Sequence, residues 1–141
     1  MAWTWDGVEE GQALPPVVVE NLTRTDLVRY AGASGDFNPI HHDEGFARAA
    51  GNPTVFGHGM LTAAFVARCV TEAVGLAGLR RFKVRFATRV WPGDTITCAG
   101  TITRKYEVDG ECRVDGEVQA TNQKGEVAVS GSFTAALPGG G

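Results

Sequence analysis

The segment HGMLTAAFVARCVTEAVGLAG, residues 58–78, is apolar on most sides of a predicted helix. Its two charged residues, Arg68 and Glu72, are four positions apart and therefore share one face. This pattern predicts a helix over residues 58–76 that is buried on all sides except one narrow stripe. Such a helix needs an apolar surface around it, which the rest of the chain must supply.

After this helix the hydrophobic period changes to two. Apolar and basic residues alternate over residues 79–91, which predicts a strand with one apolar face and one basic face. The alternating residues are Phe82, Val84 and Phe86 on one face and Arg81, Lys83 and Arg85 on the other. Further strands are predicted at residues 94–108, 111–123 and 124–137, because Pro-Gly, Asp-Gly and Lys-Gly turn pairs separate them.

The residues before the long helix predict three shorter elements. A β-branched run predicts a strand over residues 17–22. Thr25 is a suitable cap for a short helix that ends near residues 32–35. Residues 43–50 predict a further short helix, capped by Asp43.

Together these elements predict an α+β fold, in which an antiparallel sheet of about five strands wraps around one long apolar helix. We expect a single domain over residues 1–141, because no linker or repeat divides the chain, with residues 137–141 as a flexible tail. Open sheet edges are commonly covered by another subunit, so a dimer is expected.

The composition argues against several classes of protein. The chain is 43% hydrophobic and 21% charged with a net charge of -3, which is typical of a globular domain. No basic stripe indicates nucleic acid and no apolar run indicates a membrane span, so neither is an expected partner. The N-terminus lacks the pattern of a signal peptide, and three widely spaced cysteines favour free thiols in the cytoplasm.

All three histidines lie in SGDFNPIHHDEGFARAAGNPTVFGHGML, residues 34–61. Asp36 and His41 are separated by FNPI, whose Asn-Pro pair favours a turn that can bring both side chains together. A carboxylate and an imidazole form a proton-transfer pair. Asn38 is expected to fix the loop through hydrogen bonds. The alternative is that Asp36 only forms a turn and that His41 is an ordinary loop residue.

Gly59 falls in the first turn of the predicted helix. Its N–H has no acceptor inside the helix and lies at the positive end of the helix dipole. Glycine also allows a ligand oxygen to approach the backbone closely. A carboxylate, an imidazole and this N–H together indicate enolate chemistry beside a carbonyl, followed by loss or gain of water. His58 is expected to anchor the start of the helix.

A metal site is another interpretation of three histidines and an acid. No pair has helical ligand spacing, and the side chains of His41 and His42 must diverge, so we expect no metal. Ser34 lacks a base to activate it, which argues against a serine nucleophile. The sequence contains no nucleotide or redox motif, so no cofactor is expected.

The loop resembles the hydratase motif of MaoC-like dehydratases and (R)-specific enoyl-CoA hydratases. The shared elements are SGDFNPIH and HGML in that order, followed by a strand-turn-strand at RF…VWPGDTI, over roughly residues 15–136. Within the family, the chain is most similar to the catalytic subunit of mycobacterial-type (3R)-hydroxyacyl-ACP dehydratases. The resemblance implies a hot-dog fold and either a homodimer or a heterodimer with another hot-dog subunit.

The resemblance also implies roles for individual residues. Asp36 and His41 would be the catalytic pair, and the N–H of Gly59 would bind the thioester oxygen. The implied reaction is reversible hydration of a trans-2-enoyl thioester to the (R)-3-hydroxyacyl thioester in fatty-acid or related acyl metabolism. The acyl group would be carried by CoA or by acyl carrier protein.

Asn38, His58 and Arg85 are the expected substrate contacts. Arg85 belongs to a basic group that could bind the phosphate of the carrier or could simply be a solvated strand face. That group consists of Arg80, Arg81, Lys83 and Arg85. An acyl thioesterase and a non-catalytic acyl-binding subunit are the alternative functions. The spacing of Asp36 and His41 around Asn-Pro favours the hydratase over the thioesterase, and the presence of both residues argues against the non-catalytic subunit.

Overall fold

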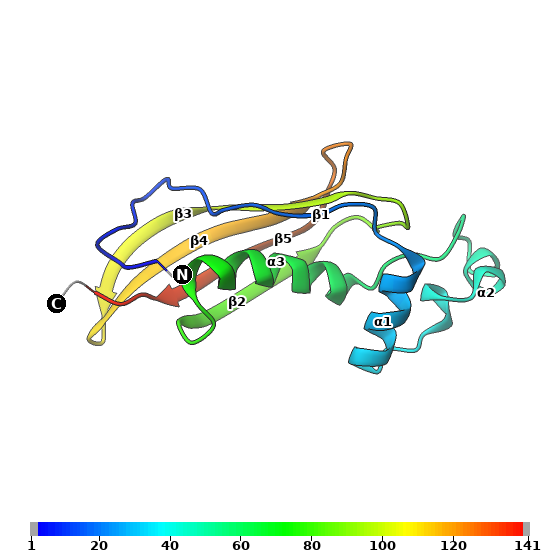
Figure 1. Cartoon of the computed structure of the whole chain (residues 1–141), viewed down its shortest axis with the longest axis horizontal. Coiled ribbons are helices and arrows are strands. Elements are labelled where there is room, and N and C mark those ends of the chain that lie inside the picture. The colour runs from blue at the N-terminus through cyan, green and yellow to red at the C-terminus, as the bar shows by residue number, and fades with distance from the viewer. Residues whose placement is uncertain (1–2, 140–141) are drawn as a thin grey trace.

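The computed structural model describes residues 3–139 and contains a five-stranded antiparallel sheet that curves around one long helix, α3 (Gly59–Val74) (Figure 1). The strand order is β1-β3-β4-β5-β2. The strands are β1 (Val17–Val19), β2 (Leu79–Phe86), β3 (Ile96–Val108), β4 (Glu111–Thr121) and β5 (Val127–Ala136). The remaining elements are α1 (Arg24–Ser34), the 3-10 helix η1 (Pro39–His41) and α2 (Glu44–Ala49). The predicted α+β arrangement is confirmed.

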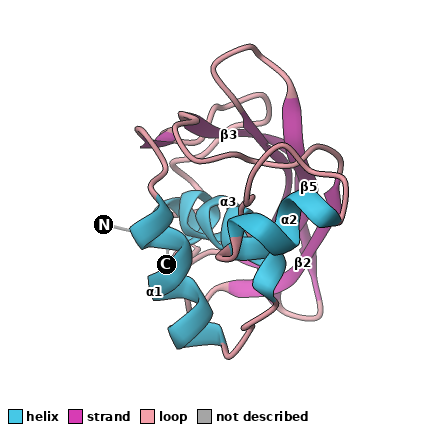
Figure 2. Ribbon diagram, turned by 90° about the vertical axis from the view of Figure 1, so that its right-hand side faces the viewer, coloured by secondary structure: helices cyan, strands magenta, loops and turns pink. Residues whose placement is uncertain are grey.

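Helix α3 lies within the curve of the sheet, as the end-on view in Figure 2 shows. Eight of its residues are buried, at the spacing expected for a helix covered along most of its surface. The exposed stripe carries Arg68 and Glu72, whose side chains form an ion pair of 2.7 Å. The helix ends at Val74, two residues before the predicted end, because Gly75 adopts a positive φ of 81°.

The predicted turns are confirmed and fix the strand register. Asp109 and Gly110 both have positive φ, 51° and 78°, as a type I′ hairpin turn requires. Gly93 has a φ of 95° in the Pro-Gly turn that leads into β3.

Several predicted boundaries are wrong for physical reasons. β2 ends at Phe86 rather than at residue 91, because the N–H groups of Ala87 and Thr88 both donate to the carbonyl of Ala128. Thr23 rather than Thr25 caps α1, since its hydroxyl accepts the N–H of Asp26 in a capping box. The first strand is limited to Val17–Val19.

The predicted tail is also too long. Leu137 is buried and donates its N–H to the carbonyl of Cys112, and the carbonyl of Pro138 accepts the N–H of Trp5. Residues 140–141 of the predicted tail lie outside the described residues. No helix between residues 3 and 139 is long and apolar enough to cross a membrane.

Glycine at one core position makes room for the largest fully buried side chain. Gly116 lies opposite Phe133 in the pairing of β4 with β5. A Cβ at Gly116 would lie 2.3 Å from Cζ of Phe133, which is 1% exposed. The ring of Phe133 therefore fills the space that a side chain at position 116 would need.

Candidate active site

Asp36 belongs to the loop between α1 (Arg24–Ser34) and η1 (Pro39–His41). Figure 1 shows α1 and the segment that follows it beyond the end of the sheet. The N–H of Asp36 donates to Ser34 Oγ at 3.2 Å, and Oδ1 of Asp36 accepts the N–H of Asn38 at 3.2 Å. Oδ1 of Asn38 in turn accepts the N–H of Ile40 at 3.1 Å. Asn38 thus fixes the shape of this loop, as expected from the sequence.

This loop brings Asp36 and His41 together. Oδ2 of Asp36 lies 3.9 Å from Nε2 of His41, and the Asp36 side chain is 49% exposed while that of His41 is 10% exposed. The separation is too long for a direct hydrogen bond. It is suitable for one water molecule that contacts both groups.

The tautomer of neutral His41 follows from its second nitrogen. Nδ1 lies 2.6 Å from the carbonyl oxygen of Phe56. A carbonyl oxygen only accepts hydrogen bonds, so Nδ1 carries the proton. In the neutral ring Nε2 therefore presents its lone pair toward Asp36, and His41 can accept a proton at that atom.

His58 contacts both the ring of His41 and the backbone of Asp36. Its ring stacks on His41 with a centroid distance of 3.9 Å and is only 1% exposed. Nε2 of His58 lies 3.2 Å from the backbone carbonyl oxygen of Asp36, so Nε2 carries the proton. Burial lowers the pKa of His58 from 6.5, although the hydrogen bond to Asp36 acts in the opposite direction.

When neutral, the two stacked rings are therefore opposite tautomers, with the proton on Nδ1 of His41 and on Nε2 of His58. Nδ1 of His58 is buried and has no hydrogen-bond partner among residues 3–139. The edge of the Tyr30 ring packs on His58 at a centroid distance of 4.9 Å. His58 thus connects the backbone of Asp36 and the ring of His41 to the start of α3, where it is the N-cap residue.

Gly59 is the first residue of α3, and its N–H has no hydrogen-bond acceptor within the described part of the chain. It lines a pocket of about 770 Å³ together with Asp36. A Cβ at Gly59 would lie 3.3 Å from the Phe86 ring, which also lines this pocket. The remaining lining residues are Phe56, Gly57, Met60, Thr62, Ala87, Thr88, Arg89, Val90, Trp91, Ala128 and Val129.

Asp36, His41 and His58 are close enough to be considered as metal ligands, with ligand atoms within 4.8 Å of one another. However, one nitrogen of each imidazole already donates to a backbone carbonyl. The two rings are also stacked with an interplanar angle of 27°, so their remaining lone pairs lie in nearly parallel planes. Metal ligands must converge on one point, which this arrangement does not favour.

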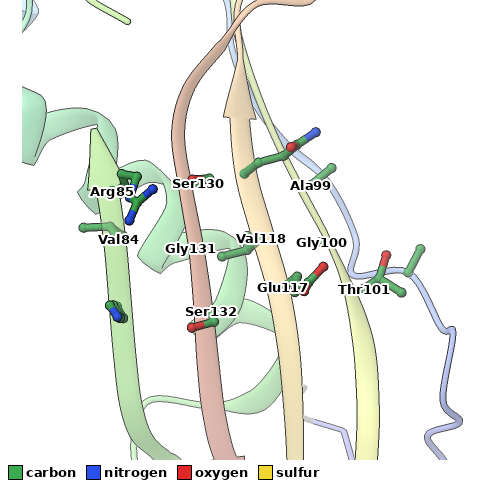
Figure 3. Close-up of a pocket in the computed structure, with 13 residues that line it drawn as sticks. Val84, Arg85, Ala99, Gly100, Thr101, Glu117, Val118, Ser130, Gly131 and Ser132 are labelled. Carbon is green, nitrogen blue, oxygen red and sulfur yellow. The ribbon is translucent and has the colours of Figure 1, made fainter. Parts of the chain in front are cut away.

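The structure does not bring Arg85 to this pocket. Arg85 and Lys83 line a separate depression of about 860 Å³ with Ser130 and Ser132, and Figure 3 shows Arg85 beside Ser130 on the sheet. The neighbouring Phe86 points to the opposite face and lines the pocket of Asp36.

Arg80 is occupied by an ion pair. Its guanidinium lies 2.6 Å from Oε2 of Glu111 and holds the pKa of that carboxyl down at about 2, with help from Arg113. Arg80 also donates to the backbone carbonyls of Ala77 and Gly78. The basic residues of β2 therefore do not form one free cationic patch.

Two pocket residues were not predicted from the sequence. Arg89 is exposed in the loop after β2, and its guanidinium lies 4.9 Å from the centroid of the Phe56 ring. Thr62, one turn into α3, is 3% exposed and faces the same pocket. Pro92 and Gly93 predict a turn close to Arg89 in the sequence. The contact of Arg89 with Phe56 depends on tertiary structure, which no local pattern indicates.

Comparison of the sequence with known proteins identifies a family and several curated relatives. The family described as "MaoC like domain" matches residues 9–124. The 3-hydroxyacyl-thioester dehydratase X of Mycobacterium tuberculosis is 42% identical over 76 residues, which cover 54% of this chain and 26% of that protein. The chain spans between 3% and 28% of the length of eight curated relatives that it matches.

Two solved structures share the fold. The R-hydratase PhaJ1 of Pseudomonas aeruginosa superposes with a TM-score of 0.84 at 24% identity, covering 97% of this chain and 86% of that one. A chain of the ChsH1-ChsH2 complex from Mycobacterium tuberculosis superposes with a TM-score of 0.78 at 25% identity, covering 92% of this chain and 98% of that one. These neighbours identify the arrangement of α3 and the sheet as a hot-dog fold.

Proposed function

Since the chain belongs to the family of MaoC-like domains, we propose that it catalyses the reversible hydration of a trans-2-enoyl thioester to the (R)-3-hydroxyacyl thioester. One observation carries the proposal. Asp36, whose carboxylate lies 3.9 Å from the imidazole of His41, lines the same pocket as Gly59, whose N–H has no acceptor among residues 3–139. The relative that is named a 3-hydroxyacyl-thioester dehydratase supports the same chemistry. The acyl carrier is CoA or acyl carrier protein.

Hydration begins with a water molecule held between Asp36 and His41. The carboxylate of Asp36 accepts one hydrogen bond from the water, and Nε2 of His41 accepts the other. As the water oxygen forms a bond to C3 of the substrate, Nε2 of His41 takes a proton from it. The nearby carboxylate stabilises the resulting imidazolium.

Addition to C3 moves the electron pair of the double bond toward the thioester carbonyl. The N–H of Gly59, at the positive end of α3, donates to the enolate oxygen. The imidazolium of His41 then gives its proton to C2, which restores the thioester carbonyl and the neutral ring. One water molecule has been added across C2 and C3, and dehydration follows the reverse path.

The test is an ultraviolet assay that follows loss of the conjugated enoyl thioester. We expect Asp36→Asn and His41→Ala to lower kcat at least about 100-fold, because each removes one of the two groups that hold and deprotonate water. His42→Ala is the matched control, since the neighbouring His42 is exposed and does not line the pocket. The control is expected to retain wild-type turnover and thermal stability.

Three results would contradict the proposal. Near-normal rates in both Asp36→Asn and His41→Ala would remove the catalytic assignment. Release of free thiol from an acyl thioester, without loss of the enoyl chromophore, would identify a thioesterase instead. Absence of turnover with short, long and steroid-like enoyl thioesters, alone and with a partner subunit, would favour a non-catalytic acyl-binding protein.

A second hot-dog chain is inferred as the partner that covers β2. Among the strands that the structure describes, β2 is paired only with β5, so its other edge is open. Two large apolar side chains on or near it, Phe86 and Leu76, are 54% and 80% exposed. The ChsH1-ChsH2 structure, one chain of which shares this fold, is a complex and supports such pairing. Sedimentation is expected to show a dimer at micromolar concentration, and a monomer at every concentration would contradict this for a homodimer.

We also infer a reducing compartment such as the cytoplasm. Cys69, Cys98 and Cys112 are free thiols in the described part of the chain.

A further inference from the structure

The pocket has one charged residue of each sign. Of its lining residues between positions 3 and 139, Asp36 is the only acid and Arg89 is the only base. Asp36 is used in the proposed chemistry, whereas Arg89 is not. An exposed guanidinium on the rim of a substrate pocket attracts anionic groups of a ligand.

The backbone on both sides of Arg89 is held in place. The N–H of Thr88 donates to the carbonyl of Ala128 at 3.3 Å, and the carbonyl of Val90 accepts the N–H of Gly57 at 2.7 Å. Val90 is 3% exposed and anchors this segment to the core. The side chain of Arg89 therefore extends from a fixed position.

The guanidinium of Arg89 packs on an aromatic ring that also contacts His41. It lies 4.9 Å from the centroid of the Phe56 ring, and the same ring meets the His41 ring edge-on at 5.2 Å. One aromatic side chain thus separates Arg89 from His41. A cation separated from His41 by this ring contacts a group attached to the substrate, rather than the reacting atoms themselves.

Arg89 is also free to bind a ligand. Five arginines form ion pairs with carboxylates, but Arg89 forms none with residues 3–139. The paired arginines are Arg24, Arg48, Arg68, Arg80 and Arg113. The contact with Phe56 is a cation–π contact that engages no oxygen acceptor, so the N–H groups of the guanidinium can still bind an oxyanion.

We propose that Arg89 binds the phosphate of the phosphopantetheine arm that carries the acyl thioester. This inference rests on the proposed function and names a contact that makes the enzyme selective for phosphorylated carriers. CoA and acyl carrier protein both contain this phosphate, so the contact serves either source. Arg89 takes the role that the sequence suggested for the basic face of β2.

The test compares three crotonyl thioesters that differ only in the carrier: pantetheine, 4′-phosphopantetheine and CoA. Arg89→Gln is expected to lower kcat/KM about tenfold for the two phosphorylated carriers, as a charge-assisted contact at a partly exposed site would. With crotonyl-pantetheine, which lacks the phosphate, Arg89→Gln and wild type should agree within about twofold. The difference should shrink as KCl concentration rises, since salt screens an exposed contact.

Arg104→Gln is the matched control. Arg104 also packs over an aromatic ring, at 4.2 Å from the centroid of Tyr106, but it does not line this pocket. It is expected to behave as wild type with all three thioesters. Arg89→Lys should recover part of the preference for phosphate because it keeps the charge but loses the planar fork.

Two outcomes would overturn the proposal. One is an equal loss with crotonyl-pantetheine, which would make Arg89 structural. The other is a loss with crotonyl-CoA but not with crotonyl-4′-phosphopantetheine, which would assign Arg89 to the nucleotide part of CoA. A separate assay of Arg89→Gln with crotonyl-acyl carrier protein distinguishes the two sources of the phosphate, and a loss equal to that with crotonyl-CoA supports the shared contact.

A binding measurement separates this inference from the proposed reaction. Titration calorimetry with unacylated 4′-phosphopantetheine and with pantetheine requires no turnover. Wild type should bind the phosphorylated compound about tenfold more tightly, and Arg89→Gln should bind both alike. Equal binding of both compounds by wild type would overturn the role of Arg89, whereas absent turnover with intact phosphate preference would overturn the hydratase alone.

Discussion

Replacing His58 with leucine removes the N–H group that holds the backbone carbonyl of Asp36. That hydrogen bond is 3.2 Å long and contributes about 1 kcal/mol net. The stacked contact with His41 and the edge contact with Tyr30 contribute about 0.5–1.5 kcal/mol each. Leucine recovers part of the apolar contact, so His58→Leu is expected to lower the free energy of unfolding by about 2–3 kcal/mol.

The effect on catalysis should be about as large as the effect on stability. The backbone of Asp36 is held by Ser34 at its N–H and by His58 at its carbonyl. Without the second bond Asp36 can move relative to His41, and a displacement of about 1 Å from productive geometry can cost about 100-fold. We therefore expect kcat of His58→Leu to fall about 100-fold, with KM within about threefold of wild type.

His58→Gln separates positioning from packing. The side-chain amide of glutamine reaches about the position of Nε2 and can donate to the same carbonyl. This variant loses the stacked ring but should keep kcat within about tenfold of wild type. Thermal unfolding by circular dichroism establishes that both variants are folded at the assay temperature.

Nitrogen chemical shifts of the histidine rings provide a second readout. Wild type should show His41 protonated at Nδ1 and His58 at Nε2 at neutral pH. A folded His58→Leu with wild-type kcat would refute the positioning role, and so would equal losses in the leucine and glutamine variants. The reverse tautomer at either ring would refute the assigned hydrogen bonds.

Three further outcomes are expected. Gly59→Ala should lower kcat/KM by about 10–100-fold, because a methyl group 3.3 Å from the Phe86 ring obstructs approach to the N–H, and Tm measured alongside should change little. Gly116→Ala should lower the free energy of unfolding by about 2–3 kcal/mol, since its Cβ would lie 2.3 Å from Cζ of Phe133; an unchanged denaturant midpoint would contradict that collision. Because burial lowers the pKa of His58, its neutral state contributes stability that is fully present above pH 6.5 and is lost as pH falls toward the lowered folded-state pKa. Denaturation series from pH 7.5 to 5 should show a shallower decline for His58→Gln, and parallel curves would exclude this linkage.

The fold was predictable because local patterns and global packing agree. The period of two after Gly78 and the Asp109–Gly110 pair define strands and a turn without reference to the rest of the chain. Element ends were less predictable, since they depend on partners elsewhere. β2 stops where Ala128 accepts two N–H groups, and α1 is capped by Thr23, two residues before the predicted Thr25.

The site was predictable only where its residues are close in sequence. Asp36 and His41 meet because the intervening Asn-Pro turn is local. The stacking of His58 on His41 and the contact of Arg89 with Phe56 join residues 17 and 33 positions apart, which no local pattern indicates. The prediction that Arg85 contacts the substrate did not take into account that Arg85 and Phe86 point to opposite faces of β2. If the apolar face of β2 covers α3, the basic face must point away from the helix and from its N-terminal end.

The lobe formed by α1, η1 and α2 lies beyond the sheet, whereas α3 lies inside it (Figure 1). Asp36 and His41 belong to the lobe, and Gly59 belongs to the body of the domain. Small segments outside a sheet open at lower free energy than the strands they adjoin. Heating should therefore inactivate the enzyme before the sheet melts, so that activity recovers on cooling from temperatures at which the far-ultraviolet spectrum of the strands has not yet changed.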